Sequence, residues 1–373
     1  MQKPGITAVI LAAGYSDRMG RFKPLLDLGG QPVITRSVET LHGAGLKDIR
    51  VVVGYQRASL LPVLKKLQVR VVINDKYADG MFSSVLAGIG SLEAKKGSFF
   101  ILPADIPLVR AQTIRYLMEM CAFYQGKILI PSFMGRRGHP PLVPVGHIQV
   151  IRQYSGDRGL KGALAKLEDD TISVPVADEN ILFDMDTPAK YIELQERWKQ
   201  RHVPSPDECG AIASMFGMAE HTLRHCRAVA EIAGRLTDNL NRAGCVLDRD
   251  LIVAAALLHD LARDKPNHAR EGAKLVAELG FPEVAALIGT HMDMPAGSAD
   301  SVSAAEVLYL ADKVVQEDRQ VSLEQRFCQK LSREQENAQA LQRIELRYRT
   351  ARSIEARIAL LTGGQAAMPG SKP

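Results

Sequence analysis

The sequence predicts an α/β half with a mostly parallel sheet, followed by an all-α half, and three observations support this division. Short β-branched runs alternate with helical stretches from residue 6 to about residue 190. No strand pattern follows residue 207, and apolar residues recur there at helical spacing. The 373 residues also suffice for two cores, because ordinary domains hold about 100–200 residues.

Strands and helices of the first half follow one another in a regular order. Runs rich in Val, Ile and Phe predict strands, and the segments between them predict helices. The predicted strands span residues 6–14, 49–55, 69–75, 98–105 and 127–133, and the predicted helices span residues 32–45, 60–67, 83–92 and 113–124. This alternation favours a parallel sheet covered on both faces. Because ligands of such sheets bind beyond the carboxyl ends of the strands, the loops there form the candidate site.

A linker separates the two predicted halves. A predicted helix over residues 188–201 gives way to Val203-Pro-Ser-Pro-Asp207, whose prolines and turn formers interrupt regular structure. The predicted helices beyond it span residues 222–236, 249–261, 269–279, 284–291, 303–315 and 337–361. We therefore expect one domain over residues 1–200, a linker over 201–208, an all-α domain over 209–362 and a flexible tail over 363–373.

Composition and charge exclude several classes of protein. Hydrophobic residues make up 46% of the chain and charged residues 24%, as in soluble globular proteins. The longest apolar run, Leu251 to Leu258, is far shorter than the roughly 20 residues that cross a bilayer. The net charge of +5 is interspersed, so neither nucleic acid nor a membrane is the expected partner. Five scattered cysteines without a CxxC pair predict no disulfide framework, and a reducing cytoplasm is the expected location.

The loop after the first predicted strand has the features of a phosphate-binding site. It reads LAAGYSDRMGRFKP over residues 11–24. Gly14 and Gly20 permit sharp turns that would let successive backbone N–H groups approach phosphate oxygens, and Arg18 and Lys23 add positive charge. The loop matches neither GxxxxGK nor GxGxxG, so a different class of phosphate binder is predicted.

This loop and four further segments resemble the MobA-like nucleotidyltransferases over about residues 5–198. LAAGxSxRMGxxK is similar to the signature of that family. The further segments follow in the family's order: GMFSSV from Gly80, LPADIPL from Leu102, GHP from Gly138 and DMDTP from Asp184. The resemblance implies a Rossmann-like nucleotidyltransferase fold for the first domain. One departure is Ile106, where many relatives have Gln.

The same resemblance implies a reaction and a set of residue roles. Within the family, Leu-Ala-Ala-Gly is typical of enzymes that use CTP and Leu-Ala-Gly-Gly of enzymes that use GTP, so Ala13 implies CTP. The implied reaction transfers CMP to the phosphate of molybdopterin and releases pyrophosphate, and a molybdoenzyme or its chaperone would receive the product. The implied nucleotide-binding residues are Leu11, Ala12, Ala13, Gly14, Gly20, Lys23, Ser83 and Asp105, and the implied acceptor-binding residues are Ser84 and His139.

The chemistry of the residues agrees with this reaction. An acceptor phosphate is already anionic, so catalysis consists mainly of positioning and charge neutralisation, which we assign to Arg18 and Lys23. Asp105, at the end of an apolar predicted strand, would hold Mg²⁺, a cation that prefers carboxylate oxygen. Asp184 or Asp186 would complete that metal site.

Structural alternatives accompany several of these assignments. Asp105 lies close to a proline and could simply form a turn. His139 could be a packed loop residue, and Ser83 and Ser84 could cap the helix that follows them. A sugar or alditol cytidylyltransferase would share the first loop, so the acceptor stays open.

The helical half carries a second set of candidate ligands: His225, His259, Asp260, His268, His291 and Asp312. An apolar predicted helix ends in His259-Asp260, which places an imidazole beside a carboxylate at the border of a core, where charges need partners. His225 and Asp312 lie on the apolar stripes of their own predicted helices.

The pattern H…HD…D resembles the HD phosphohydrolase superfamily over about residues 215–320. The resemblance implies that His225, His259, Asp260 and Asp312 bind a divalent metal, while His268 and His291 serve a second metal or a phosphate. His221 competes as the first ligand, and we prefer His225 because HCRAVAEIA continues as in that family. LLHDLARDK, HAREGA and YLADKVV are similar to HD enzymes that cleave dinucleoside polyphosphates.

Mixed imidazole and carboxylate ligands suit Fe, Mn, Ni or Zn. Such a metal would lower the pKa of a bound water and generate hydroxide to attack phosphorus. Lys265, Arg270 and Lys313 could steady the phosphate, or they could lie on solvated helix faces. Three functions stay open for the chain: a cofactor cytidylyltransferase with an appended hydrolase of a nucleotide or phosphate ester, a transferase for another metabolite joined to a nucleotide-polyphosphate hydrolase, and a transferase controlled by a non-catalytic nucleotide sensor.

Overall fold

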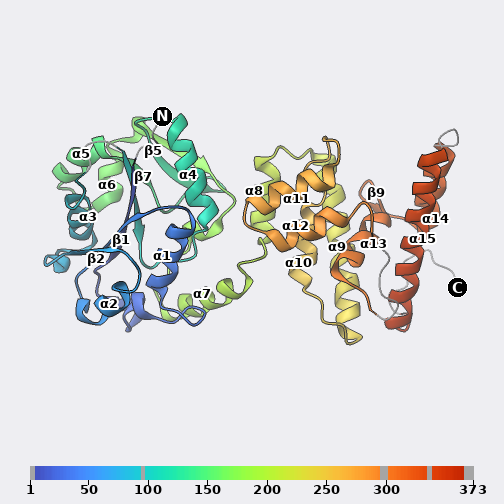
Figure 1. Cartoon of the computed structure of the whole chain (residues 1–373), viewed down its shortest axis with the longest axis horizontal. Coiled ribbons are helices and arrows are strands. Elements are labelled where there is room, and N and C mark those ends of the chain that lie inside the picture. Colours follow the sequence, from blue (N-terminus) through green and yellow to red (C-terminus); the bar gives the residue numbers. More distant parts are fainter. Residues whose placement is uncertain (1–4, 94–96, 295–300, 334–337, 365–373) are drawn as a thin grey trace. The chain divides into compact units, whose positions relative to one another are not determined.

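The computed structural model describes residues 5–93, 97–294, 301–333 and 338–364, which belong to two compact units, Met1–Arg201 and His202–Pro373 (Figure 1). Each unit has its own buried core. The predicted flexible tail over residues 363–373 lies outside the described residues from residue 365 onward.

The first unit is built on one eight-stranded sheet. Its strands neighbour one another in the order β3 (Arg70–Ile73), β2 (Asp48–Val53), β1 (Ile6–Ala12), β4 (Ser98–Pro103), β7 (Leu142–Pro144), β5 (Ile128–Phe133) and β6 (Arg136–Arg137), and β8 (Thr171–Pro175) pairs with β5. The strands from β3 to β4 are parallel, as are β5 and β8, whereas β7 and β6 pair antiparallel with their neighbours. The predicted mostly parallel sheet is confirmed, although β6, β7 and β8 were not expected.

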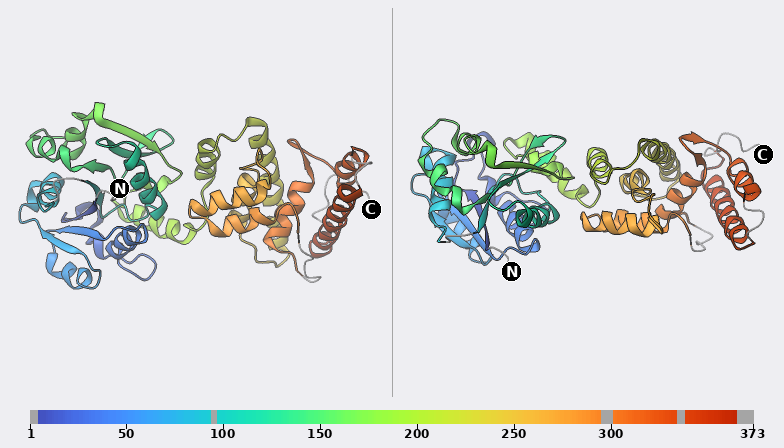
Figure 2. Two further views of the ribbon diagram at one scale, coloured as in Figure 1. Left: turned by 45° about the horizontal axis from the view of Figure 1, so that its top comes forward. Right: turned by 90° about the horizontal axis from the view of Figure 1, so that it is seen from above.

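Helices lie on both faces of this sheet (Figures 1 and 2). They are α1 (Val33–Gly43), α2 (Arg57–Leu64), α3 (Met81–Gly90), α4 (Ala111–Phe123), α5 (Ile148–Gln153), α6 (Gly159–Ala165) and α7 (Pro188–Gln200). α3 packs on β1 and β2 and contacts α5 and α6, while α4 packs on β5 and contacts α1. The apolar stripes of these helices therefore cover a sheet that is apolar on both sides.

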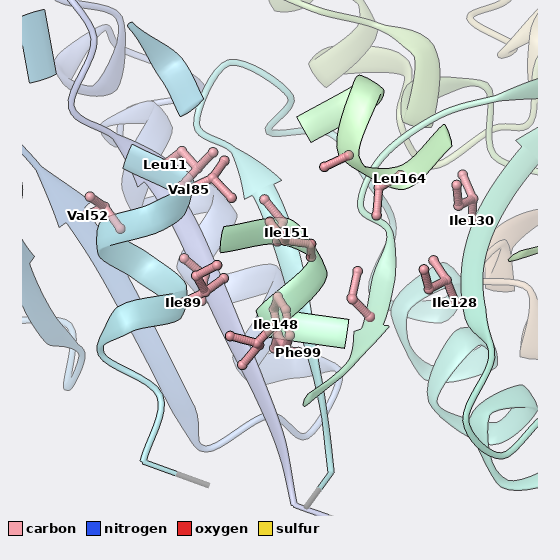
Figure 3. Packing of buried hydrophobic residues seen from close by; sticks show 14 of the residues in the cluster. Leu11, Val52, Val85, Ile89, Phe99, Ile128, Ile130, Ile148, Ile151 and Leu164 are labelled. Atoms are coloured by element: carbon pink, nitrogen blue, oxygen red, sulfur yellow. The ribbon is translucent and has the colours of Figure 1, made fainter. Parts of the chain in front are cut away.

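A buried cluster fixes α3 against the sheet (Figure 3). Alternate residues of a strand point to opposite faces, and Val9 and Leu11 of β1 both join this cluster with Val85 and Ile89 of α3. Gly88 permits the close approach, since a Cβ there would lie 2.5 Å from Val9 Cγ1. This packing brings the first turn of α3 to the carboxyl end of β1, where the predicted phosphate loop begins.

A second packed region surrounds Trp198, the one tryptophan of the sequence. The ring lies between two guanidinium groups, with the Cζ atoms of Arg36 and Arg201 at 4.4 and 3.9 Å from its centroid. It also covers the turn at Gly29, whose φ is 63° and where a Cβ would lie 1.9 Å from Trp198 Nε1. Trp198 packs against an apolar cluster that includes Leu194, so α7 is anchored to the first unit.

The second unit is helical, as predicted. Its helices are α8 (Pro206–Met215), α9 (Glu220–Arg242), α10 (Arg249–Leu258), α11 (His268–Glu278), α12 (Pro282–Thr290), α13 (Ala304–Lys313), α14 (Leu323–Arg333) and α15 (Ala338–Leu361). The apolar helix α10 contacts α8, α9, α12 and α13 and forms the centre of the core. None of the helices within the described residues is long and apolar enough to cross a membrane.

Two features of this unit differ from the sequence prediction. Helix α8 begins at Pro206, within the predicted linker, because Ser205 and Glu208 form a capping box at its start. A two-stranded hairpin, β9 (Val315–Gln316) and β10 (Arg319–Gln320), follows α13 in a half that was predicted to be all-α. Strands of two residues carry no readable period, so the sequence could not predict this hairpin.

Candidate active sites

The phosphate loop leaves β1 at Ala12 and is fixed to its neighbours by backbone hydrogen bonds. Ala104 donates to the carbonyl of Leu11 at 3.0 Å, and Tyr55 donates to that of Ala13 at 3.1 Å. Ser16 adopts a left-handed conformation, with φ of 63°, and its Oγ accepts a hydrogen bond from the Lys23 amide at 3.2 Å. The loop therefore folds back on itself and turns Lys23 toward the ends of the strands.

Lys23 joins three segments that lie far apart in the sequence. Its Nζ contacts Asp105 Oδ2 at 3.1 Å and Asp186 Oδ1 at 2.6 Å. Arg18 contacts the other oxygen of Asp186 at 2.7 Å. Burial alone would lower the pKa of Lys23, but the hydrogen bonds and charges of Asp186 and Asp105 raise it, so the amine stays protonated. The predicted catalytic residues of the first unit thus form one ion-pair network.

A third carboxylate adjoins this network. The amide of Met185 donates to the carbonyl of Asp105 at 2.9 Å, which holds the DMDTP segment beside the end of β4. Burial and the charges of Asp186 and Asp105 raise the pKa of Asp184 above its usual value. Several carboxylates in one place form a hard-oxygen donor set, and this set fits Mg²⁺.

A cavity of about 350 Å³ opens over the network. Most of the predicted residues line it: Leu11, Ala12, Ala13, Gly14, Arg18, Lys23, Ser84, Asp105 and Asp186. Gly20 and Ser83 do not line it, and Gly20 instead closes the turn after Met19, with φ of 65°. The volume lies within the usual range of small-molecule sites.

Ser83 and Ser84 lie inside α3 and do not cap it, because the helix begins at Met81 and Gly80 is its N-cap. Both hydroxyls accept from the buried Asn74 side chain, at 2.9 and 3.0 Å from its Nδ2. Asn74 therefore positions the first turn of α3, a role that no sequence motif indicated.

His139 lies in a second cavity of about 750 Å³ that also reaches Gly80 and Met81. Burial lowers the pKa of His139, against the opposing charges of Asp105 and Asp184. Its Nδ1 is buried and has no hydrogen-bond partner among the described residues. Three further basic residues, Arg137, Arg158 and Lys161, line the same cavity. The two cavities share a border, so ligands bound in them would meet end to end.

Three tyrosines beside the smaller cavity were not predicted. The ring centroid of Tyr15 lies 5.0 Å from that of Tyr55 and 5.3 Å from that of Tyr77. Tyr15 and Tyr77 both line the cavity. They come from three loops, so no spacing in the sequence could have indicated that they meet.

The second unit gathers the six predicted ligands from five helices and their ends. One group, His225, His259 and Asp260, and another, Asp260, His268 and His291, each offer ligand atoms within 4.8 Å of one another. Asp312 Oδ1 lies 3.2 Å from His225 Nε2 and 3.7 Å from His259 Nε2. Asp260 is shared by both groups, with Oδ2 facing His225 and His259 and Oδ1 facing His268 and His291. The competing His221 is exposed and belongs to neither group.

Backbone carbonyls set the orientation of three of these rings. The Nδ1 atoms of His225, His259 and His291 lie 2.7, 2.8 and 2.7 Å from the carbonyls of Glu317, Ala256 and Ile288 respectively. Protonated Nδ1 atoms leave each Nε2 free to bind a metal, the usual arrangement for ligating histidines. The Nε2 of His259 is buried and has no hydrogen-bond partner among the described residues. Such an orphaned nitrogen fits a metal ligand.

The carboxylates of this site are held in their charged form. Burial would raise the pKa of Asp312, but Lys313 and the hydrogen bond from His225 bring it well below its usual value. His259 and Arg263 likewise lower the pKa of Asp260 against the effect of burial. Charged carboxylates and imidazole nitrogens together fit Mn, Fe, Ni or Zn.

The cations predicted to steady a phosphate are placed differently from one another. Lys313 is buried and contacts Asp312 at 2.6 Å, while Lys265 and Arg270 are exposed. Arg326 of α14, which was not predicted, is also near the site, since the charges of Asp312 and Asp260 both act on it. Arg326 lies 14 residues after Asp312, and the sequence could not predict that the two are close. The β9–β10 hairpin between them reverses the chain and returns α14 to the site.

Comparison with known proteins identifies both units. Residues 8–171 match the MobA-like NTP transferase domain, and residues 222–317 match the HD domain. Molybdenum cofactor cytidylyltransferase of Escherichia coli (strain K12) is 26% identical over 196 residues, which cover 52% of this chain and 98% of that protein. Nicotine blue oxidoreductase of Paenarthrobacter nicotinovorans is 28% identical over 193 residues, which cover 49% of this chain and 93% of that protein.

Among solved structures, a nucleotidyl transferase from Methanothermobacter thermautotroptrophicus matches with a TM-score of 0.47 and 23% identity, over 52% of this chain and 98% of that one. Residues 8–171 of this chain are therefore a MobA-like NTP transferase domain, and residues 222–317 are an HD domain.

Proposed function

We propose that the first unit transfers CMP from CTP to the phosphate of molybdopterin and releases pyrophosphate. The observation that carries the proposal is the network of Lys23, which joins the phosphate loop to Asp105 and Asp186 in the wall of the smaller cavity. The relative named molybdenum cofactor cytidylyltransferase, matched over 98% of its length, supports this acceptor. A second relative of similar identity is named as an oxidoreductase, so the reaction has to be measured.

In the proposed complex the triphosphate of CTP occupies the smaller cavity. Arg18 and Lys23 would bind its oxygens and offset the charge that develops at the α-phosphorus. Lys23 is suited to this role because its raised pKa keeps the amine charged at neutral pH. The buried Cβ of Ala13 lines the same cavity and would limit the space for the base, which supports CTP as the nucleotide.

Asp105 and Asp186 are the residues that we expect to hold Mg²⁺. When bound, Mg²⁺ would neutralise charge on the phosphates and orient them. Asp184 would support the site from the neighbouring position. The acceptor would occupy the larger cavity, where neutral His139 and the basic Arg158 and Lys161 could bind a phosphorylated pterin.

Pyrophosphate release tests this proposal. The purified chain is assayed with Mg²⁺ and CTP, GTP or ATP, with and without molybdopterin, in the wild type, in Asp105→Asn and in the exposed control Asp169→Asn. We expect release to require CTP and molybdopterin together, and to fall roughly hundredfold or more in Asp105→Asn because a charge at the reaction centre is lost. Asp169→Asn should match the wild type. Release from CTP without any need for the pterin would overturn the acceptor, and indifference to CTP would overturn the nucleotide.

We further propose that the HD unit binds a transition metal and hydrolyses a nucleotide or a phosphate ester. The orphaned Nε2 of His259, facing Asp260 and Asp312, supports a metal there. When bound, the metal would supply a water of lowered pKa as nucleophile. We place the reaction in the cytoplasm, since the five cysteines, all within the described residues, are free.

Metal content and hydrolysis test this second activity. The full chain is freed of metal, reloaded with Mn²⁺, Fe²⁺, Ni²⁺ or Zn²⁺, and assayed on nucleoside polyphosphates beside Asp312→Ala. Metal binding and turnover in the wild type, both lost in Asp312→Ala, are the expected result. Full metal occupancy without turnover would identify a non-catalytic nucleotide sensor instead.

A further inference from the structure

Two of the cations at the HD site are already engaged with its ligands. Lys313 Nζ contacts Asp312 Oδ2 at 2.6 Å and the carbonyl of His291 at 3.2 Å. Arg263 forms an ion pair with Asp260. Both therefore pair with carboxylates that we predict to bind the metal.

The hairpin β9–β10 follows α13 and leads into α14 (Figure 1). The charges of Asp312 and Asp260 act on Arg326 of α14, so this side chain lies near the same site. The carbonyl of Glu317, in the turn of that hairpin, accepts a hydrogen bond from the Nδ1 of His225 at 2.7 Å. The amide of Val321 donates to the carbonyl of Val314 at 2.9 Å, which closes the hairpin and fixes the start of α14. Hydrogen bonds thus connect the end of α13, the hairpin and the start of α14.

The inward face of α14 carries Arg326. Leu323 and Phe327 are buried, and residues three and four apart lie on one face of a helix, so Arg326 shares that face. Its Nε is buried and has no hydrogen-bond partner among the described residues. Burial lowers the pKa of Arg326, and the charge of Asp312 opposes that effect. A guanidinium keeps its charge under such conditions, so it needs an anionic partner.

We infer that Arg326 binds a phosphate oxygen of the substrate at the HD metal site. This role rests on the proposed hydrolase activity of that site. The planar guanidinium matches phosphate geometry, and a ligand oxygen would satisfy the buried Nε, which none of the described residues contacts by a hydrogen bond. The anion that Arg326 binds is therefore a phosphoryl group held at the same time by the metal.

Inorganic phosphate is the probe for this inference. Its binding to the Mn²⁺-loaded full chain is measured by calorimetry in the wild type, Arg326→Gln and Arg326→Lys. A charge-assisted hydrogen bond of ordinary strength predicts that Arg326→Gln binds phosphate roughly tenfold to hundredfold more weakly. Arg326→Lys should recover part of the loss, and Mn²⁺ content should stay unchanged, because Arg326 is not a ligand. Phosphate binding to Asp312→Ala, which lacks a predicted metal ligand, is measured in the same way. This value is subtracted as binding at other sites.

Arg242→Gln serves as the matched control. It removes the same charge from an exposed position about 25 Å along α9 from His225. Unchanged phosphate affinity in Arg326→Gln, with normal metal content, would overturn the role of Arg326 and leave the proposed hydrolase intact. Loss of Mn²⁺ from Arg326→Gln would show a structural role and also overturn the inference. A wild type that takes up no metal would overturn the hydrolase and this role together.

Discussion

Lys23 illustrates how one side chain can combine three motifs that look unrelated along the chain. Its contacts with Asp105 and Asp186 bridge 82 and 163 residues of sequence. Both carboxylates oppose the desolvation of the amine, and together they raise the pKa of Lys23 above its usual value. In a variant without the Lys23 amine, the carboxylates of Asp105 and Asp186 would repel one another. We expect a bound cation to replace the lost positive charge.

Ala13 provides a test of nucleotide choice. The residue is buried and lines the smaller cavity, so Ala13→Gly would enlarge the cavity by one methyl group. A single methyl group in a tight pocket discriminates ligands by roughly tenfold or more. We expect the ratio of kcat/KM for CTP to that for GTP to fall by about this factor in Ala13→Gly. Ala8→Gly, at a buried position of β1 that does not line the cavity, is the comparison, and an unchanged ratio in Ala13→Gly would contradict the size argument.

Motif order was sufficient to predict that several residues of the first unit lie close together. Arg18, Lys23, Asp105 and Asp186 could be placed together because the carboxyl ends of parallel strands share one edge of a sheet. The tyrosines at positions 15, 55 and 77 could not, because their contacts are side chain to side chain across loops. Their roles, like those of the predicted residues, stay predictions until the variants are measured.

Among the helices and strands, those with a long apolar pattern were predicted and those with a short one were missed. α10 was recognisable because its buried face extends over most of the helix, whereas β9 and β10 have two residues each. α8 was overlooked because Pro204 and Pro206 indicated a linker, yet Pro is well tolerated in the first turn of a helix. The short elements nevertheless matter for function, since the hairpin positions both His225 and α14.

An ion pair ties α13, which carries Asp312, to α15. Glu306 contacts Arg357 and also forms a capping box with Ser303. Burial would raise the pKa of Glu306, but Arg357 and Ser303 lower it. The pair therefore stabilises the fold above the unfolded pKa of Glu, about 4.3, and this contribution is lost as the pH falls through the lower folded value.

Glu306→Gln tests this pair, because Gln keeps the capping box and removes the charge. We expect a loss of about 2 kcal/mol in the free energy of unfolding at pH 7, shrinking below about pH 4. Denaturant unfolding across that pH range gives the measurement. Glu345→Gln removes an exposed pair on α15 and should cost less than about 0.5 kcal/mol. An equal loss in both variants, or a loss independent of pH, would contradict the argument.

The whole molecule consists of two units that each have a core and a set of candidate ligands. Ligands stabilise the unit that binds them by mass action, by about 2.7 kcal/mol at a hundred times Kd. We expect calorimetry to resolve two unfolding transitions, of which chelation of the HD metal lowers one by several degrees. CTP with Mg²⁺ should raise the other. In Asp312→Ala the metal response should vanish while the CTP response stays, and a single transition that follows both ligands would contradict independent unfolding.

Trp198 gives this chain a built-in optical label. Because it is the one tryptophan of the sequence and is packed between Arg36 and Arg201 in the first unit, fluorescence excited at the red edge of protein absorption reports on that unit alone. Far-ultraviolet dichroism instead follows the helices of both units. The wavelength of maximum tryptophan emission should shift when α7 is released from the rest of the first unit. Chelation of the HD metal should leave this wavelength unchanged. Unfolding of the first unit can therefore be compared with unfolding of the whole chain in one cuvette, with no dye attached and no residue replaced.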